Sequence, residues 1–257
     1  MKAIILAAGR GSRLYPYTEH IPKCLLDIGG ETIIENQLNH LRDCGVDEVV
    51  VVVGFSYKRV EEFLTSYSPP GIKIKTLYNP FYRNADSLIS LWTARCEMND
   101  DIVVMNGDDV FVRGVLEKVI EQRNENICLP VKVKKIYEDE DMKAKLKGDL
   151  VVEISKHILK PSAESIGIRI FRGMGVELMK RAIEEEVREE GAEKKWYVSA
   201  IKRLITKGYK IKCLDIGGLF WMDVDYPRDL LHARFNSHRF LKKTREDKER
   251  ILRVVGI

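Results

Sequence analysis

The side chains best suited to chemistry lie near the N-terminus, where a glycine-rich turn follows a short apolar run. Residues 3–8 are apolar, Gly9 and Gly11 follow them, and Arg13 and Lys23 come after the turn. Glycine lets backbone N–H groups approach an anion closely, because it carries no side chain. Arg13 and Lys23 add fixed positive charge beside those groups. The segment therefore predicts a cradle for a polyphosphate.

Two common phosphate-binding motifs do not fit this segment. A P-loop requires GxxxxGK followed by Ser or Thr, and the chain lacks that string. A dinucleotide-binding fingerprint requires a third glycine where Leu14 stands, and an acidic residue after the second strand, where residues 54–56 read GFS. The sequence therefore argues against a nicotinamide-dependent dehydrogenase. A simple turn with surface cations is the alternative that involves no ligand.

Strand-like and helix-like segments alternate through the first half of the chain. The predicted strands are residues 3–8, 48–53, 72–78, 101–105 and 127–133. The predicted helices are residues 31–44, 58–66, 87–96 and 113–122. This alternation predicts a mostly parallel sheet covered by helices on both faces, with ligands bound at the carboxyl ends of the strands.

The second half of the chain is less regular. Residues 139–147 (DEDMKAKLK) are highly charged and predict a segment that faces solvent. Further strands are predicted at residues 150–155, 166–171 and 210–215, and further helices at residues 176–189, 198–206 and 228–254. The chain has no repeats and no low-complexity linker, so we expect one continuous domain over residues 1–257.

The composition argues against several classes of protein. Of the 257 residues, 45% are hydrophobic and 32% charged, and the net charge of +4 comes from interspersed charges, so we expect no nucleic-acid surface. The five cysteines form no CxxC pair and their number is odd, which argues against a disulfide framework and favours the cytoplasm. No apolar run approaches the roughly 20 residues of a membrane span, so we expect no membrane partner.

The N-terminal segment resembles the signature of the sugar-phosphate nucleotidyltransferases, which is LAAGxGxR followed by a variable loop and Pro-Lys. This family includes phosphocholine and inositol-1-phosphate cytidylyltransferases and glucose-1-phosphate thymidylyltransferase. The resemblance implies a Rossmann-like three-layer α/β/α nucleotidyltransferase fold with a mostly parallel central sheet. It also implies that Arg13 and Lys23 are catalytic. The nucleotide-binding residues that it implies in this segment are Leu6, Ala7, Ala8, Gly9, Gly11 and Ser12.

Two further segments resemble the metal site of that family, which holds Mg²⁺. Asp108 follows a glycine at the end of a predicted strand, where relatives have an aspartate that binds the metal and the nucleotide. Asp223 and Asp225 lie in a late segment similar to WxDVDxxxD, and in an extended chain both point the same way. Alignment on the downstream Asp229 favours Asp225, whereas alignment on Trp221 favours Asp223, and both remain candidates.

Residues 82–88 stand where relatives have the loop that contacts the base. Asn84 and Ser87 are the candidate nucleotide-binding residues, because the Arg-x-x-x-Ser arrangement that begins at Arg83 is similar to that of cytidylyltransferases. The thymidylyl relatives have a glutamine-bearing, glycine-rich loop here, which this chain lacks. CTP is therefore favoured, and the alternative role of Ser87 is an N-cap of the following helix.

The acceptor site is less defined by the sequence. Relatives carry a lysine between the strands predicted at residues 150–155 and 166–171, where Lys156 fits one spacing and Lys160 another. Trp221 is a candidate acceptor-binding residue through the late segment. Four aromatic residues, with core packing as their alternative role, could form a wall for a choline-like cation: Trp92, Trp196, Tyr197 and Trp221.

Together these segments predict a magnesium-dependent nucleotidyltransferase. We expect it to move CMP from CTP onto a phosphorylated small alcohol, polyol or sugar 1-phosphate and to release pyrophosphate. The alternatives are a dTTP- or UTP-dependent hexose-1-phosphate enzyme and a non-catalytic nucleotide-binding subunit. Residues 1–133 are expected to bind the nucleotide and residues 134–226 the acceptor. The helical tail at residues 227–257 could pack on the domain or form a homodimer.

Overall fold

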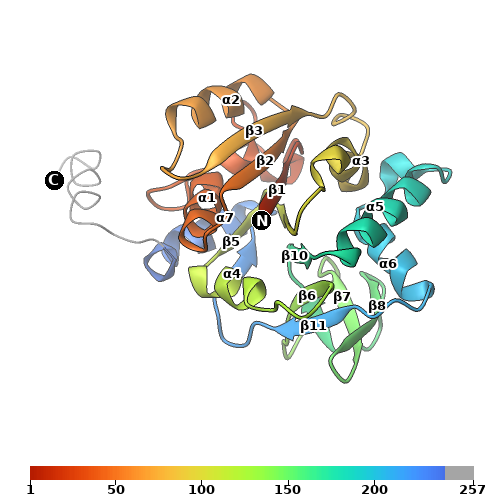
Figure 1. The fold of residues 1–257 in the computed structure, drawn as a ribbon. Helices are drawn as coiled ribbons and strands as arrows, with labels where there is room; N and C mark the ends of the chain where they lie inside the picture. The colour runs from red at the N-terminus through yellow and green to blue at the C-terminus, as the bar shows by residue number, and fades with distance from the viewer. Residues whose placement is uncertain (241–257) are drawn as a thin grey trace.

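The computed structural model describes residues 1–240 and contains a ten-stranded sheet in the order β11-β8-β7-β9-β6-β10-β4-β1-β2-β3 (Figure 1). Four strands at one end of this sheet are parallel to one another. They are β1 (Lys2–Ala7), β2 (Glu48–Val53), β3 (Lys73–Tyr78) and β4 (Ile102–Asn106). Parallel pairing brings the carboxyl ends of these strands to one edge, which is where α/β proteins bind their ligands.

Antiparallel strands extend this sheet on the side of β4. β10 (Ile168–Phe171) pairs with β4 and with β6 (Ile127–Lys132), and β11 (Lys212–Asp215) runs parallel to β6. A smaller antiparallel group continues the sheet: β7 (Lys143–Lys147), β8 (Leu150–Ser155) and β9 (Ala163–Ser165). The two halves of the chain therefore share one continuous sheet.

Helices cover both faces of the sheet, as the sequence predicts. The helices on one face are α1 (Ile33–Asp43), α2 (Tyr57–Ser66) and α4 (Arg113–Ile120). Those on the other face are α3 (Ser87–Thr93), α5 (Met174–Val187) and α6 (Val198–Thr206), and Figure 1 shows α5 beside α6. In β2, Val49, Val51 and Val53 pack on the first face, whereas Val50 and Val52 pack on the second. The uninterrupted valine run is explained by burial on both sides, and the three-layer α/β/α fold is confirmed.

A separate two-stranded sheet joins the middle of the chain to its late segment. β5 (Asp109–Phe111) pairs antiparallel with β12 (Trp221–Asp223), and Asp223 lies opposite Asp109. The sequence did not predict these strands, because three residues are too few for a periodic pattern. Their pairing carries the late aspartates to the end of β4, more than 100 positions away in the chain.

The expectation that residues 139–147 face solvent holds for part of the segment, such as Asp139 and Lys145, and is wrong for residues 143 and 144. Residues 143–147 form β7, and Lys143 and Ala144 are buried. Lys143 donates from Nζ to the carbonyl oxygens of Asp139 (3.3 Å) and Lys156 (2.9 Å), so the buried ammonium is satisfied by backbone acceptors. A charged sequence can therefore form an inner strand when main-chain oxygens receive its donors.

The C-terminal helix is shorter than predicted within the described residues. α7 (Pro227–Phe235) ends well before the predicted limit at residue 254, and a short 3₁₀ turn follows at Ser237–Arg239. The predicted helical residues from 241 onward lie outside the described part of the chain. Between residues 1 and 240, no helix has the length and apolar character needed to cross a bilayer.

Candidate active site

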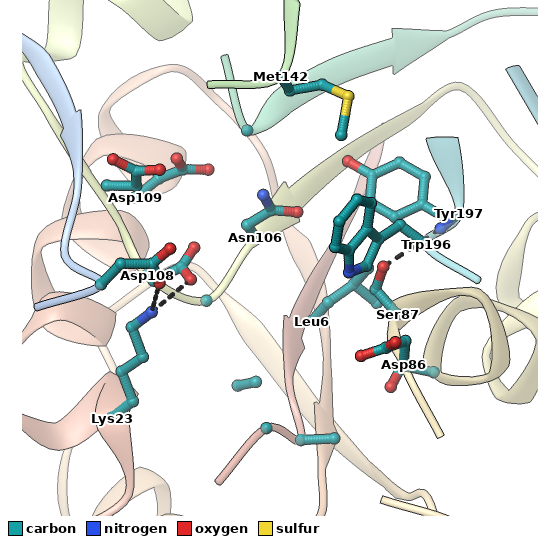
Figure 2. Close-up of a pocket in the computed structure, with 18 of the residues that line it drawn as sticks. Leu6, Lys23, Asp86, Ser87, Asn106, Asp108, Asp109, Met142, Trp196 and Tyr197 are labelled. Carbon is teal, nitrogen blue, oxygen red and sulfur yellow. Dashed lines mark hydrogen bonds and ion pairs between the residues drawn. The ribbon is translucent and has the colours of Figure 1, made fainter. Parts of the chain in front are cut away.

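A cavity of about 390 Å³ opens at the carboxyl ends of β1 and β4. Residues from both halves of the chain line it, as Figure 2 shows: Lys23 and Asp108 lie on one side, and Ser87 and Trp196 lie on the other. The first side holds a cluster of charges, and the second holds polar and aromatic groups. The two sides of the cavity therefore offer different chemistry to a ligand.

The glycine-rich turn after β1 lines the cavity beside Lys23. Gly11 has a φ of +64°, and a Cβ on it would lie 3.1 Å from the Cβ of Lys23. A Cβ on Gly9 would meet nothing within 4 Å, so its backbone is open to a ligand. Thr18 donates from Oγ1 to the Gly11 carbonyl at 2.7 Å, and Leu14 is fully buried behind the turn. These contacts hold the turn in the form that an anion cradle needs.

The catalytic cations predicted from the sequence lie among carboxylates. Lys23 donates from Nζ to Asp108 Oδ2 at 2.7 Å and to Asp225 Oδ1 at 2.5 Å. Arg13 donates from Nη1 to Asp225 Oδ2 at 3.4 Å and to Glu140 Oε2 at 3.3 Å. Burial lowers the pKa of Lys23, but Asp108 and Asp225 outweigh it and raise the pKa above its ordinary value. The ammonium is therefore charged at all physiological pH values.

Negative charge in this cluster exceeds what the two cations balance. Burial raises the pKa of Asp223 to about 7, and the carboxylates of Asp108 and Asp225 add to the rise. Asp108 Oδ1 is buried without a hydrogen-bond partner among the described residues. Burial also raises the pKa of Asp225, but Lys23 outweighs it and holds that pKa below its ordinary value. Both late aspartates line the cavity, in different electrostatic surroundings.

The charges that line the whole cavity show the same excess. Seven carboxylates and four cationic side chains are present among the lining residues. The carboxylates are those of Asp86, Asp108, Asp109, Glu140, Glu164, Asp223 and Asp225, and the cations are Arg13, Lys23, Lys156 and Arg169. Burial raises the pKa values of Asp109, Glu164 and Asp223, so the negative charge at neutral pH is smaller than the number of acidic side chains implies.

The carboxylate cluster fits a hard divalent cation that arrives with phosphate oxygens. Within residues 1–240, no three acidic, histidine or cysteine side chains are already grouped as metal ligands, because Lys23 lies between Asp108 and Asp225. Magnesium is commonly held by one or two carboxylates together with substrate phosphates. The unpartnered Asp108 Oδ1 and the neighbouring Asp223 supply such oxygens.

The far end of the cavity is formed by the start of α3. Ser87 accepts a hydrogen bond at Oγ from the backbone N–H of Tyr197 at 3.2 Å, so it does not act as an N-cap. Asp86 holds the N-cap position, but its carboxylate makes no capping bond and lines the cavity, where burial raises its pKa. Asn84 is exposed and does not line the cavity. Of the two predicted base contacts, the structure brings only Ser87 to the site.

The structure distinguishes the two lysines that the sequence offered as candidates for acceptor binding. Lys156 lines the cavity, donates from Nζ to Glu140 Oε2 at 2.8 Å and lies over the Trp196 ring at 4.5 Å from its centroid. Lys160 is exposed and lies outside the lining. The spacing that pointed to Lys156 is therefore the one that reaches the cavity.

The four predicted aromatic residues have different roles. Trp221 lines the cavity but is buried and donates from Nε1 to Asp109 Oδ1 at 2.9 Å. Trp196 and Tyr197 also line it, whereas Trp92 lies elsewhere and donates to Glu184. Since Lys156 covers the Trp196 ring, that aromatic face already has a cation.

Several lining residues were not identified from the sequence. Glu140 and Glu164 lie in or beside strands that the sequence did not predict. Arg169 stands inside the apolar strand β10, which reads IRIF. Its position in the middle of an apolar strand was the sequence feature that could have marked Arg169 as a site residue, because arginine is rarely buried without a specific partner.

The chain is similar to known nucleotide-processing proteins. The family model described as MobA-like NTP transferase domain matches residues 3–160. The Bifunctional IPC transferase and DIPP synthase of Aquifex aeolicus is 27% identical over 243 residues, which cover 94% of this chain and 52% of that protein. The UTP--glucose-1-phosphate uridylyltransferase AglF of Haloferax volcanii is 28% identical over 244 residues, which cover 89% of this chain and 93% of that protein.

A solved structure shares the fold. The inositol-1-phosphate CTP transferase from T. maritima superposes with a TM-score of 0.74 and 20% identity, covering 91% of this chain and 96% of that one. The chain spans about half the length of the bifunctional curated relatives that it matches.

Proposed function

This chain belongs to the MobA-like NTP transferase family, and we propose that it is a nucleotidyltransferase that uses CTP. The acceptor is a phosphorylated small alcohol, polyol or sugar 1-phosphate, and pyrophosphate is the second product. The observation that supports this most is the cluster of Lys23, Asp108 and Asp225 beside the glycine-rich turn, in a cavity that residues of both halves of the chain line.

The cations of the cluster lower the repulsion between two anionic substrates. A phosphate oxygen of the acceptor attacks the α-phosphorus in line, a P–O bond forms, and the bond to pyrophosphate breaks. Because the nucleophile is already an anion, no general base is required. Lys23 and Arg13 exchange their carboxylate partners for phosphate oxygens and offset the charge that develops in the transition state.

Asp108, with Asp223 or Asp225, is proposed to hold Mg²⁺ once the triphosphate is present. When bound, Mg²⁺ supplies positive charge to the phosphate oxygens. The carboxylates would determine where the ion binds. The ion would also give Asp223 a positive partner, whereas in the protein alone burial and the neighbouring carboxylates outweigh the effect of Lys23 and raise the pKa of Asp223. The excess of acidic side chains in the cavity supports this role.

The polar groups at the start of α3 support CTP as the donor. Asp86 places a carboxylate, which only accepts hydrogen bonds when ionised, beside Ser87 at the end of the cavity away from Lys23 (Figure 2). Cytosine carries an exocyclic amino group that such an acceptor can bind, whereas uracil and thymine present a carbonyl there. The UTP-dependent relative keeps uridylyl transfer as the second candidate.

A pyrophosphate-release screen tests the proposal. Purified protein is incubated with Mg²⁺, one of five triphosphates (CTP, UTP, dTTP, ATP, GTP) and a panel of phosphomonoesters. We expect release only when a triphosphate and an acceptor are both present, and at least about tenfold faster with CTP. Equal or faster release with UTP or dTTP would select the hexose-1-phosphate alternative. Tight nucleotide binding without release under any combination would favour the non-catalytic alternative.

A further inference from the structure

Arg169 is a buried cation on the acceptor side of the cavity. Its side chain comes from the middle of β10, is 2% exposed and lines the cavity with Ser165 and Tyr197. Nη2 donates to Ser165 Oγ at 3.2 Å, and the guanidinium carbon lies 5.0 Å from the centroid of the Tyr197 ring. Nε and Nη1 are buried and have no hydrogen-bond partner among the described residues.

Arg169 differs from the other three cations of the cavity in having no acidic partner. Arg13 contacts Glu140 and Asp225, Lys23 contacts Asp108 and Asp225, and Lys156 contacts Glu140; these ion pairs are all within 4.0 Å. Within residues 1–240, no carboxylate oxygen lies within 4.0 Å of the Arg169 guanidinium. A buried charge without a counter-ion is costly, so a function must be sought for it.

Two acidic side chains of the cavity lining, Asp109 and Glu164, form no ion pair with Arg169, although Asp109 interacts with it electrostatically. Asp109 accepts at Oδ1 from Trp221 Nε1, and a Cβ on Gly167 would lie 1.8 Å from Asp109 Oδ2, which shows how closely this carboxylate packs on the backbone. Glu164 forms its ion pair with Lys134 at 2.7 Å. Arg169 attracts Asp109 electrostatically, but burial outweighs that attraction and raises the pKa of Asp109, and no hydrogen bond joins the two side chains. Nε and Nη1 therefore keep two N–H donors that no described residue uses.

We propose that the acceptor carries an oxyanion besides its reacting phosphate, in the simplest case a carboxylate, and that the guanidinium of Arg169 recognises it. The inference rests on the nucleotidyltransferase function proposed above, because it specifies the acceptor of that reaction. A carboxylate receives two parallel N–H donors from a guanidinium, which matches the paired vacancy at Nε and Nη1. The hydroxyl of Tyr197, also buried without a hydrogen-bond partner in the described chain, lies beside the same group.

The same arrangement argues against a choline-like acceptor. A quaternary ammonium would enter a compartment that already contains the unpaired charge of Arg169, and like charges repel strongly where water is excluded. Lys156 lies over one face of Trp196 and Arg169 over one face of Tyr197, so a further cation at either ring would meet a like charge. An uncharged polyol would leave the charge of Arg169 without compensation.

Matched pairs of phosphomonoesters test the inference. Each pair differs by one carboxylate: glucuronic acid 1-phosphate against glucose 1-phosphate, 3-phosphoglycerate against glycerol 3-phosphate, and O-phosphoserine against phosphoethanolamine. With CTP and Mg²⁺, kcat/KM for the preferred pair is expected to be roughly 10- to 100-fold higher for the carboxylate member, the range for a charged hydrogen-bonded contact. Equal kcat/KM values within every pair, or a preference for phosphocholine, would overturn the inference while leaving the proposed function in place.

Substitution of Arg169 identifies the group responsible. Arg169→Gln is expected to remove most of the preference in kcat/KM for the carboxylate member and to leave the KM for CTP within about threefold. Arg169→Lys keeps the positive charge but loses the planar guanidinium, so its preference for the carboxylate member is expected to lie between those of the wild type and Arg169→Gln. This variant keeps the test informative if Arg169→Gln folds poorly. Arg181→Gln, at an exposed site outside the cavity, is the control for loss of one positive charge. Equal losses for both members of a pair would indicate a structural role only.

A binding measurement separates failure of the inference from failure of the proposed function. If no acceptor supports pyrophosphate release, the proposed function fails, and the thermal midpoint of each protein with the paired ligands still decides about Arg169. A carboxylate member that raises the Tm of the wild type but not of Arg169→Gln supports the inference. Equal shifts within the pairs, or no shift with any ligand, overturn it.

Discussion

Lys23 and Asp225, which are 202 positions apart in the chain, are joined by a hydrogen bond of 2.5 Å from Nζ to Oδ1. Asp108 accepts from the same ammonium at 2.7 Å. Three segments therefore meet at one nitrogen atom: the loop after β1, the end of β4 and the residues after β12. The ammonium has three N–H donors, of which these two carboxylates use two, so the protein holds the cation in position with one donor left.

Replacing Lys23 by alanine should lower kcat by about 10²- to 10³-fold, because a fixed charge at the transition state is lost. Steady-state pyrophosphate release measures this, and the Tm reports whether the fold is kept. Lys160→Ala is the matched control, since this lysine is exposed outside the cavity. A Lys23→Ala enzyme with kcat within threefold of the wild type would contradict the role.

Removing the divalent cation should abolish turnover. Excess EDTA is expected to stop pyrophosphate release, and added Mg²⁺ to restore it. Asp108→Asn should raise the Mg²⁺ concentration for half-maximal rate by at least about tenfold, because a neutral amide is a weaker ligand for a hard cation. Unchanged Mg²⁺ dependence in Asp108→Asn, together with a normal rate, would place the metal elsewhere.

The base preference should depend on Asp86. In Asp86→Asn the side chain can also donate, so the advantage of CTP over UTP is expected to fall by roughly tenfold. The comparison of kcat/KM for the two triphosphates, with the same acceptor, measures this. Asn84→Ala, which changes an exposed residue of the same loop, should leave the ratio unchanged.

Trp221 should contribute to stability through its bond to Asp109. Trp221→Phe leaves Asp109 Oδ1 without its donor in a fully buried position, which is expected to cost about 1–3 kcal/mol of unfolding free energy beyond the loss of packing. Trp92→Phe is the control, because its Nε1 contacts the half-exposed Glu184. Urea unfolding of the two variants gives the difference, and equal losses would show that the Asp109 bond contributes nothing.

Glu164 should destabilise the folded protein progressively as the pH rises from about 4.5 to about 7. Burial raises the pKa of Glu164 from 4.5 to about 7, and although Lys134 acts against this rise, Asp141 adds to it. In that window the folded protein keeps a proton that the unfolded chain releases, so increasing pH favours unfolding. Glu164→Gln should reduce this dependence by about 1–3 kcal/mol across the window, on the scale of 1.4 kcal/mol per pKa unit. Parallel pH curves for the two proteins would refute the assignment.

The parts of the site that lie in contiguous motifs could be predicted, and the parts made by tertiary pairing could not. Gly9, Gly11, Lys23 and Asp108 follow strands whose apolar runs are visible in the sequence, and all of them line the cavity. The choice between Asp223 and Asp225 could not be made, because it depends on the register of β12 against β5.

The antiparallel half was harder to predict because its strands are short or charged. β7 reads KAKLK, and its burial depends on carbonyl oxygens that accept from Lys143, which no sequence pattern reports. The sequence shows that Arg169 stands in an apolar strand. It does not show that Arg169 faces a cavity, because that depends on the pairing of β10 with both β4 and β6.

Main-chain hydrogen bonds join the start of α3 to the loop before α6. The Asp86 N–H donates to the Glu193 carbonyl at 2.7 Å and the Leu88 N–H to the Lys195 carbonyl at 3.1 Å. Neither bond involves the side chains that face the cavity. A library that randomises the side chains of Asp86 and Trp196 would therefore keep both main-chain hydrogen bonds. The side chains that face the cavity could then be changed, and ligand preference redesigned, without altering how these two segments are joined.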